Sequence, residues 1–218
     1  MDLVRSISDS FVVSFQGDLD ESMWHAMRQG VEEGLGLGSP RQQPQAIVTG
    51  LGMIQAPGVD YLREGQRYAR MEPLRLILEG TYWLENAPQL ADALRATLPR
   101  LPLAVQATGI NPHFLVHCEW APTAAEVTHP GHPLGQLLGD DGCLQALRAT
   151  RPMDGGTLGI EMSFPQPVAS GVVVRFNWHV QHDNASEAAE RCARYPEHVE
   201  GLRSLAQDLA GAPGGDSA

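Results

Sequence analysis

The chain has 218 residues, 43% of them hydrophobic and 19% charged, and its 26 acidic and 15 basic side chains give a formal net charge of -11. This composition is typical of a globular protein and excludes a disordered one. The acidic balance without a basic stretch argues against nucleic acid as a partner, and it gives no support to an anionic membrane surface.

Cysteine usage and the apolar runs point to the cytoplasm. The three cysteines, Cys118, Cys143 and Cys192, are odd in number and widely spaced, which is typical of a reducing compartment. We find no secretory signal at the start and no apolar run near the ~20 residues of a membrane span. Residues 1–210 are predicted to form one domain, and residues 211–218 a flexible tail.

The first half of the chain is predicted to alternate strands and helices. Met23, Met27 and Val31 recur at helical spacing after the capping residues Asp18 and Asp20. The expected elements are a strand at residues 11–15, a helix around residues 23–31, strands at residues 46–54 and 74–84, and a helix at residues 86–98.

The second half is predicted to end in a hairpin and a helix. A Pro-rich turn at residues 165–171 joins the last two strands, and Pro196 divides the last helix into two pieces. The expected elements are a strand at residues 103–120 interrupted at 109–112, a helix at 134–148, strands at 157–164 and 172–182, and a helix at 186–209.

These elements predict an α+β fold with a mostly antiparallel sheet of about five to seven strands and helices packed on one face. Long strands and a C-terminal hairpin favour antiparallel pairing over a doubly wound parallel sheet. The residues that we expect to be buried in the core are Trp24, Leu94, Phe114, Val116, Trp178 and Val180.

Histidines are the main chemical feature of the sequence. On a strand, His113, His117 and Glu119 point to one face, and imidazole and carboxylate ligands suit zinc or iron. A solvated or hydrogen-bonded polar face predicts the same residues, and we favour that interpretation because no helical H-E-x-x-H motif supports a metal site.

A candidate binding surface combines this strand with the last one. His179 and Asp183 share the polar face of the strand at residues 172–182, opposite the core-like face. If the two long strands are neighbours, Asn111, His113, His117, His179 and Asp183 gather on one sheet face. Such a cluster would titrate near neutral pH and bind a polar ligand, a metal or a partner.

No known catalytic motif accompanies this cluster. A G-x-S-x-G elbow, a P-loop and a dinucleotide fingerprint are all absent from the sequence, so we predict neither a catalytic residue nor a cofactor. This favours a non-enzymatic interaction or accessory protein of a bacterial or phage assembly. Two alternatives stay open: a metal-dependent enzyme built on His113, His117 and Glu119, and a small-ligand-binding domain.

Two short segments carry a resemblance. Residues 107–114 (ATGINPHF) and 176–179 (FNWH) resemble a loose group of uncharacterised small bacterial or phage α+β proteins in which a strand with a G-I-N motif precedes a C-terminal hairpin. The resemblance implies the α+β fold and such an origin, and no activity. We expect a protein partner, including a second copy of the chain in a homodimer, because edge strands invite pairing.

Overall fold

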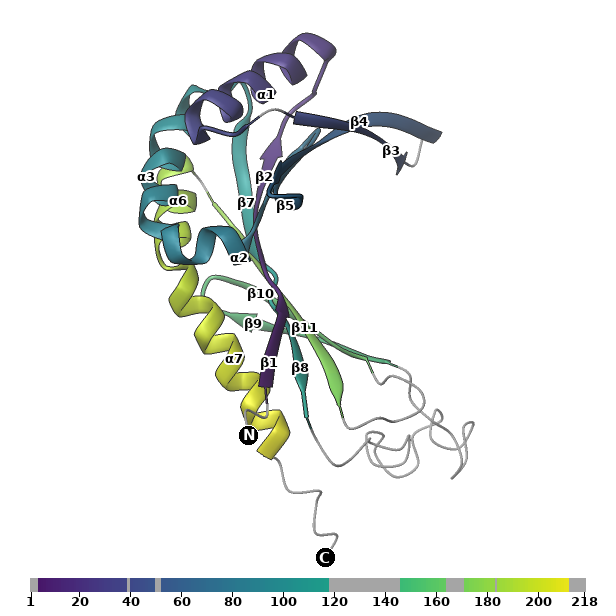
Figure 1. Ribbon diagram of the computed structural model, residues 1–218, viewed down its shortest axis with the longest axis vertical. Helices are drawn as coiled ribbons and strands as arrows, with labels where there is room; N and C mark the ends of the chain where they lie inside the picture. The colour runs from purple at the N-terminus through teal and green to yellow at the C-terminus, as the bar shows by residue number, and fades with distance from the viewer. Residues whose placement is uncertain are drawn as a thin grey trace, which may run out of the picture.

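The computed structural model describes residues 4–38, 40–49, 52–117, 146–163, 171–182 and 184–211. Its strands form one sheet (Figure 1). The strands of the first half are β1 (Val4–Ser8), β2 (Ser10–Gln16), β3 (Pro40–Thr49), β4 (Gly52–Arg63), β5 (Gln66–Glu72) and β6 (Arg75–Glu79). Those of the second half are β7 (Ala104–Ile110), β8 (His113–Val116), β9 (Ala146–Met153), β10 (Gly156–Ser163) and β11 (Val172–Gln181).

All strand pairs of the described residues are antiparallel. The central path runs β1-β8-β11-β7-β2-β6-β5-β4-β3, and β10 and β9 extend the sheet beyond β11. Strand β11 pairs with both β7 and β8, so β7 and β8 lie end to end along β11. The mostly antiparallel α+β fold is confirmed, but the described residues alone form 11 strands of the sheet, where the sequence predicts five to seven.

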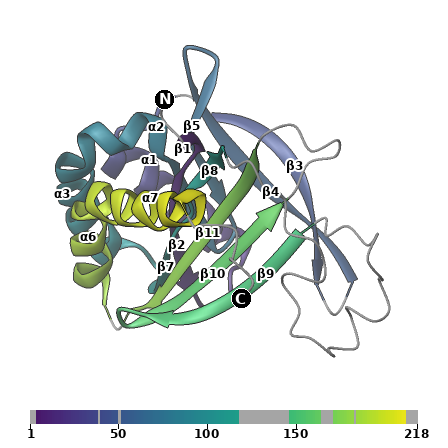
Figure 2. The ribbon, with the colours of Figure 1, turned by 90° about the horizontal axis from the view of Figure 1, so that it is seen from below.

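The helices lie on one side of this sheet (Figure 2). They are α1 (Glu21–Leu35), α2 (Gly80–Trp83), α3 (Ala87–Thr97), α6 (Ala185–Ala193) and α7 (Tyr195–Gly211), with the short 3-10 helices η1 (Leu84–Asn86) and η2 (Leu98–Arg100). Both ends of the sheet, at β3–β4 and at β9–β10, curve away from the helices, so the opposite face is concave. No helix in the described part of the chain is long and apolar enough to cross a membrane.

Helix α1 shows how local sequence places the helical layer. The carboxylate of Asp20 accepts a hydrogen bond from the backbone N–H of Met23 at 2.7 Å, which caps the helix. Gly36 ends it in the left-handed conformation at φ 60°. The buried residues Trp24, Met27 and Val31 lie three and four positions apart, on one face of the helix. The Tyr61 hydroxyl of β4 donates to Glu32 at 2.8 Å, so α1 packs on this end of the sheet.

The core lies between the helices and the sheet face that they cover. Phe114 and Phe176 from neighbouring strands meet edge to face, with ring centroids 6.1 Å apart. Alternate residues of β8 and β11 therefore point to the helical layer. Of the predicted core residues, Val180 is only half-buried, and the buried ones are Trp24, Leu94, Phe114, Val116 and Trp178.

A buried arginine ties α6 to the sheet. The guanidinium of Arg191 donates to the carbonyl and the hydroxyl of Thr108 at 3.0 and 2.9 Å, and to the carbonyl of Trp178 at 2.9 Å. It also stacks over the indole of Trp178 at 4.5 Å. Burial lowers the pKa of Arg191 to about 10, so it stays charged near neutral pH.

Three predicted elements differ from the structure. The strand predicted at residues 46–54 is wrong as a single element, because β3 ends at Thr49 and β4 begins at Gly52. The strand predicted at 74–84 ends at Glu79, because α2 starts at Gly80. Gly80 packs closely against Asp9: a Cβ added at this position would lie 2.0 Å from the carboxylate. The helix predicted at 134–148 is wrong at its end, where Ala146 begins β9; residues 134–145 lie outside the described residues.

Other predictions hold, and strands β1 and β5 were not predicted. The break at residues 109–112 is confirmed between β7 and β8, the pairing of β10 with β11 is confirmed, and the last helix divides between Ala193 and Tyr195. Strand β1 was not predicted, since its sequence VRSIS alternates without a clear apolar face. Of the tail predicted at residues 211–218, Gly211 is the last residue of α7, and residues 212–218 lie outside the described residues.

Candidate functional site on the concave face of the sheet

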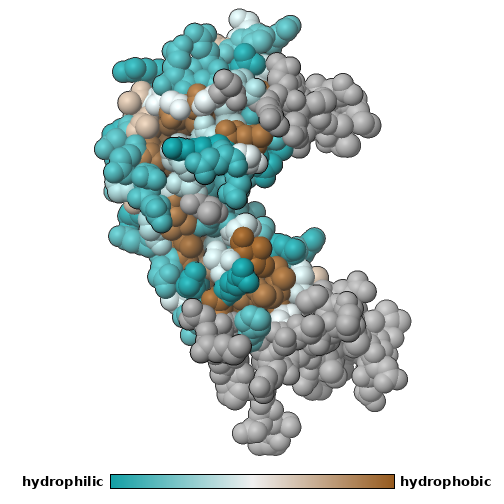
Figure 3. All heavy atoms as spheres, viewed as in Figure 1, coloured by the Kyte–Doolittle hydropathy of each residue, from teal (hydrophilic) through white to brown (hydrophobic). Residues whose placement is uncertain are grey.

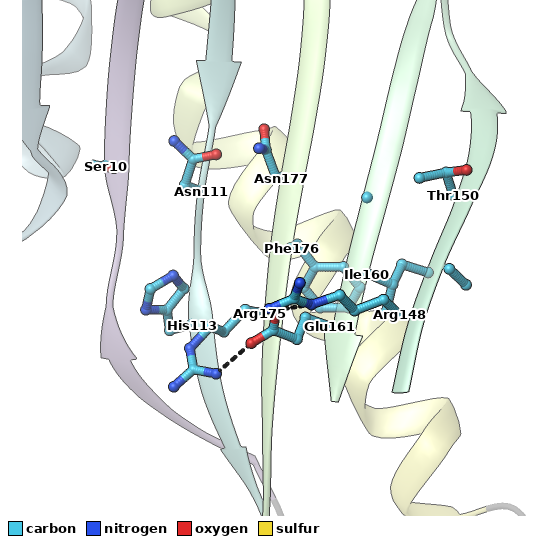
Figure 4. A pocket seen from close by; sticks show the side chains of 12 residues that line it. Ser10, Asn111, His113, Arg148, Thr150, Ile160, Glu161, Arg175, Phe176 and Asn177 are labelled. Carbon is cyan, nitrogen blue, oxygen red and sulfur yellow. Dashed lines mark hydrogen bonds and ion pairs between the residues drawn. The ribbon is translucent and has the colours of Figure 1, made fainter. Parts of the chain in front are cut away.

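Four neighbouring strands place a row of three charged side chains and a histidine on the concave face. The pairing sets His113 of β8 opposite Arg175 of β11, Arg175 opposite Glu161 of β10, and Glu161 opposite Arg148 of β9. Directly opposed residues of antiparallel strands share a face. The residues that alternate with them, such as Phe114 and Phe176, contact the core, so this arginine row points away from the helices (Figure 4).

Glu161 links the two arginines of the row. Its carboxylate accepts from Nε of Arg148 at 2.6 Å and from Nη1 of Arg175 at 2.7 Å, and Arg175 also donates to the Ser163 hydroxyl at 2.8 Å. The hydrogen bond from Arg148, reinforced by Arg175, holds the pKa of Glu161 below its usual value. The three groups are therefore all charged near neutral pH and carry one net positive charge.

Several arginine donors stay unused. Nη1 and Nη2 of Arg148, and Nε and Nη2 of Arg175, make no hydrogen bond to another described residue. The side chain of Arg148 is 80% exposed and that of Arg175 42%, so these donors are accessible. An arginine with open N–H groups suits a carboxylate or another oxyanion, which accepts two parallel hydrogen bonds.

A second row, next to the first, carries amides and hydroxyls. Ser10, Asn111, Asn177 and Thr150 come from β2, from the β7–β8 break, from β11 and from β9, and Gly159 of β10 lies between the last two. Figure 4 shows the carboxamides of Asn111 and Asn177 on the same side of the sheet as the arginine row. Gly159 has no side chain, so the surface between Asn177 and Thr150 is recessed.

The two rows border an open pocket of about 530 Å³. The described surface is hollowed on the side away from the helices, with hydrophobic and hydrophilic residues around the hollow (Figure 3). The pocket carries one surplus positive charge on a chain whose formal net charge is -11. Burial, and then the charge of Arg175, lower the pKa of His113, so this imidazole is neutral near pH 7 and adds no charge.

The sequence predicted part of this pocket. Asn111 and His113 both line it, and Nδ1 of His113 shares a hydrogen bond of 3.1 Å with the Ser8 hydroxyl. The partners in the arginine row were not predicted. Arg175 alternates with buried residues and was recognisable as a face residue, but Arg148 was assigned to the end of a helix.

The five predicted surface residues do not form one site. His117 follows the last residue of β8, which pairs with Val172, whereas His179 pairs with Gly109 at the other end of β11. About 27 Å of strand separates these two positions. His179 lines a different hollow, beside the β9–β10 turn. Asp183 lies outside the described residues.

The predicted metal ligands are only partly described. Glu119 lies outside the described residues, and His113 and His117 are four residues apart on one face. Within the described part of the chain, no group of three or more His, Cys, Asp or Glu side chains is placed to hold a metal ion.

Comparison with known proteins adds no family to this geometry. No protein-family model matches the chain, and no curated protein matches it either. The function is therefore argued from the arginine row and the pocket beside it.

Proposed function

We propose that this protein is a non-enzymatic interaction protein that binds an acidic segment of a protein partner on the concave face of its sheet. The observation that carries the proposal is the pair of arginines, Arg148 and Arg175, which present unused donors to an open pocket. A carboxylate of the partner would take up these donors beside Glu161.

The shape of the site favours a polypeptide over a small molecule. Pockets for small molecules bury most of the ligand surface. Here the rim residues Arg148, Thr150 and Asn177 are exposed, and the polar rows cross four strands. A segment that lies along an open face contacts such rows without being enclosed.

The charge of the site favours an acidic segment. The chain as a whole repels an acidic peptide, because its formal net charge is -11. Binding of an acidic peptide would thus have to come from a local positive site, and the arginine row supplies one. Attraction between partly exposed charges weakens as salt is added, so binding is expected to fall between low and physiological ionic strength.

The test compares two capped peptides, hexaglutamate and the neutral hexaglutamine, by isothermal titration calorimetry. We expect hexaglutamate to bind more tightly, and the double variant Arg148→Gln/Arg175→Gln to lose at least about tenfold in affinity, or ~1.4 kcal/mol. The control Arg95→Gln/Arg194→Gln removes the same charge from exposed helical positions and should bind as the wild type does.

A third variant examines Glu161. Glu161→Gln removes the carboxylate that competes for the two arginines, so hexaglutamate should bind several-fold more tightly than to the wild type. Equal affinity for hexaglutamate and hexaglutamine in the wild-type protein would refute the proposal. Equal losses in the two double variants would also refute it, because they would show an effect of net charge alone.

A further inference from the structure

Asn111 has a buried acceptor that the protein leaves unsatisfied. Its Oδ1 atom is buried and has no hydrogen-bond partner among the described residues. A buried polar atom without a partner destabilises the folded protein, because it has given up its hydrogen bond to water. Such an atom at the edge of a pocket is therefore a candidate contact for a ligand.

The backbone holds Asn111 in this position. Its N–H donates to the carbonyl of Ser10 at 2.9 Å, and the carbonyl of the next residue, Pro112, accepts from the N–H of Phe176 at 3.0 Å. The residue lies at the break between β7 and β8, and these two hydrogen bonds hold the break to β2 and to β11. Since the segment is tied on both sides, the side chain cannot reach another partner by a backbone shift.

The acceptor lies beside the arginine row. Asn111 and Arg175 line the same pocket, and Figure 4 shows the Asn111 oxygen on the side of Asn177, in the row next to Arg175. The pocket thus offers donors that suit a carboxylate and, one row away, an acceptor that suits an N–H group. An aspartate or glutamate residue within a polypeptide presents both groups a few bonds apart.

We propose that Asn111 accepts a hydrogen bond from a backbone N–H of the bound acidic segment, while Arg148 and Arg175 bind its carboxylate. This inference rests on the proposed function and adds the group that the pocket recognises, a backbone N–H next to a carboxylate. Asn111 is then a specificity residue, which distinguishes an acidic residue in a peptide from a carboxylate without an adjacent N–H.

The test uses two small probes that differ at this one group. N-acetyl-L-aspartate and O-acetyl-L-malate carry the same carboxylates and acetyl group, with N–H in the first and an ester oxygen in the second. Titrations followed by NMR should show about tenfold tighter binding of N-acetyl-L-aspartate to the wild-type protein. The Asn111→Leu variant should bind both probes equally, and the control Gln89→Leu, which replaces an exposed amide of α3 outside the pocket, should keep the preference.

The outcomes separate this inference from the proposed function. The comparison of the two probes on the wild-type protein needs no variant, so it holds even if Asn111→Leu fails to fold. Equal affinities there would overturn the role of Asn111 and show that solvent satisfies its oxygen, while the result with hexaglutamate would still stand. Binding of hexaglutamate without binding of either probe would also overturn the inference. Failure of hexaglutamate itself would overturn the proposed function.

Discussion

Adjacent residues of β11 lie in two different environments. Phe176 and Trp178 face the helices and are buried, 1% and 3% exposed, with aromatic and cationic partners around them. Arg175 and Asn177 face the concave side, where Arg175 is paired with Glu161 and Asn177 is exposed. The same strand thus stabilises the fold with one face and presents hydrogen-bonding groups with the other.

This difference separates stability from binding. On the helical side, Nη1 and Nη2 of the buried Arg191 donate to carbonyl groups of the sheet, and only its Nε has no partner among the described residues. On the concave side, donors of Arg148 and the acceptor of Asn111 have no partner among the described residues. Substitutions on the first side should therefore change the free energy of unfolding, and those on the second should change binding.

The largest expected effect comes from Phe176. Phe176→Ala leaves a cavity in the core beside Phe114 and should lower the free energy of unfolding by about 3–5 kcal/mol. Asn177→Ala, one residue away on the exposed face, should change it by less than about 0.5 kcal/mol. Urea unfolding of both variants measures the difference. Similar losses would show that the concave face is packed against something as closely as the core.

A smaller effect is expected at Arg191. Arg191→Met removes three hydrogen bonds between α6 and the sheet, so the free energy of unfolding should fall by about 2–3 kcal/mol. The control is Arg194→Met, three residues further on, whose side chain is 62% exposed and paired with Glu197. That variant should lose less than about 0.5 kcal/mol. If the control loses as much as Arg191→Met, the buried hydrogen bonds do not hold α6 to the sheet.

The smallest expected effect is the pH dependence of stability. Burial, followed by the charges of Arg191 and Arg194, lowers the pKa of His198 to about 4, although Glu197 and Asp154 oppose this. Below pH 6.5 the unfolded chain takes up a proton that the folded protein refuses, so stability falls as the pH drops from 6.5 toward 4. His198→Gln should flatten this fall in urea unfolding measured at several pH values.

His113 on the concave side provides the comparison. Its pKa is also lowered by burial and by Arg175, but Glu161 and Glu79 face it and oppose the shift. His113→Gln should flatten the fall in stability less than His198→Gln does. The reverse order would mean that the concave face controls the acid sensitivity of the fold.

Much of the fold could be predicted because it is local in the sequence. Alternation in residues 172–182 separates Phe176 and Trp178 from Asn177 and His179, and the structure confirms that separation. The cap at Asp20, the break before His113 and the division of the last helix were likewise readable from single residues with known backbone preferences. The strand count was not, because the apolar run at residues 46–54 conceals the junction of β3 and β4. In addition, β1 and β5 lack a clear apolar alternation, and β9 begins where a helix was predicted.

What the sequence by itself determined is which face of its own strand each residue occupies, since side chains alternate along a strand whatever its partners are. What only the tertiary structure decided is which residues of different strands meet. Antiparallel register places His117 and His179 at opposite ends of one face, and it joins Arg148 and Arg175 through Glu161. Register depends on contacts between segments far apart in the chain, so no local pattern encodes it, and the arginine row appears only once the sheet is assembled.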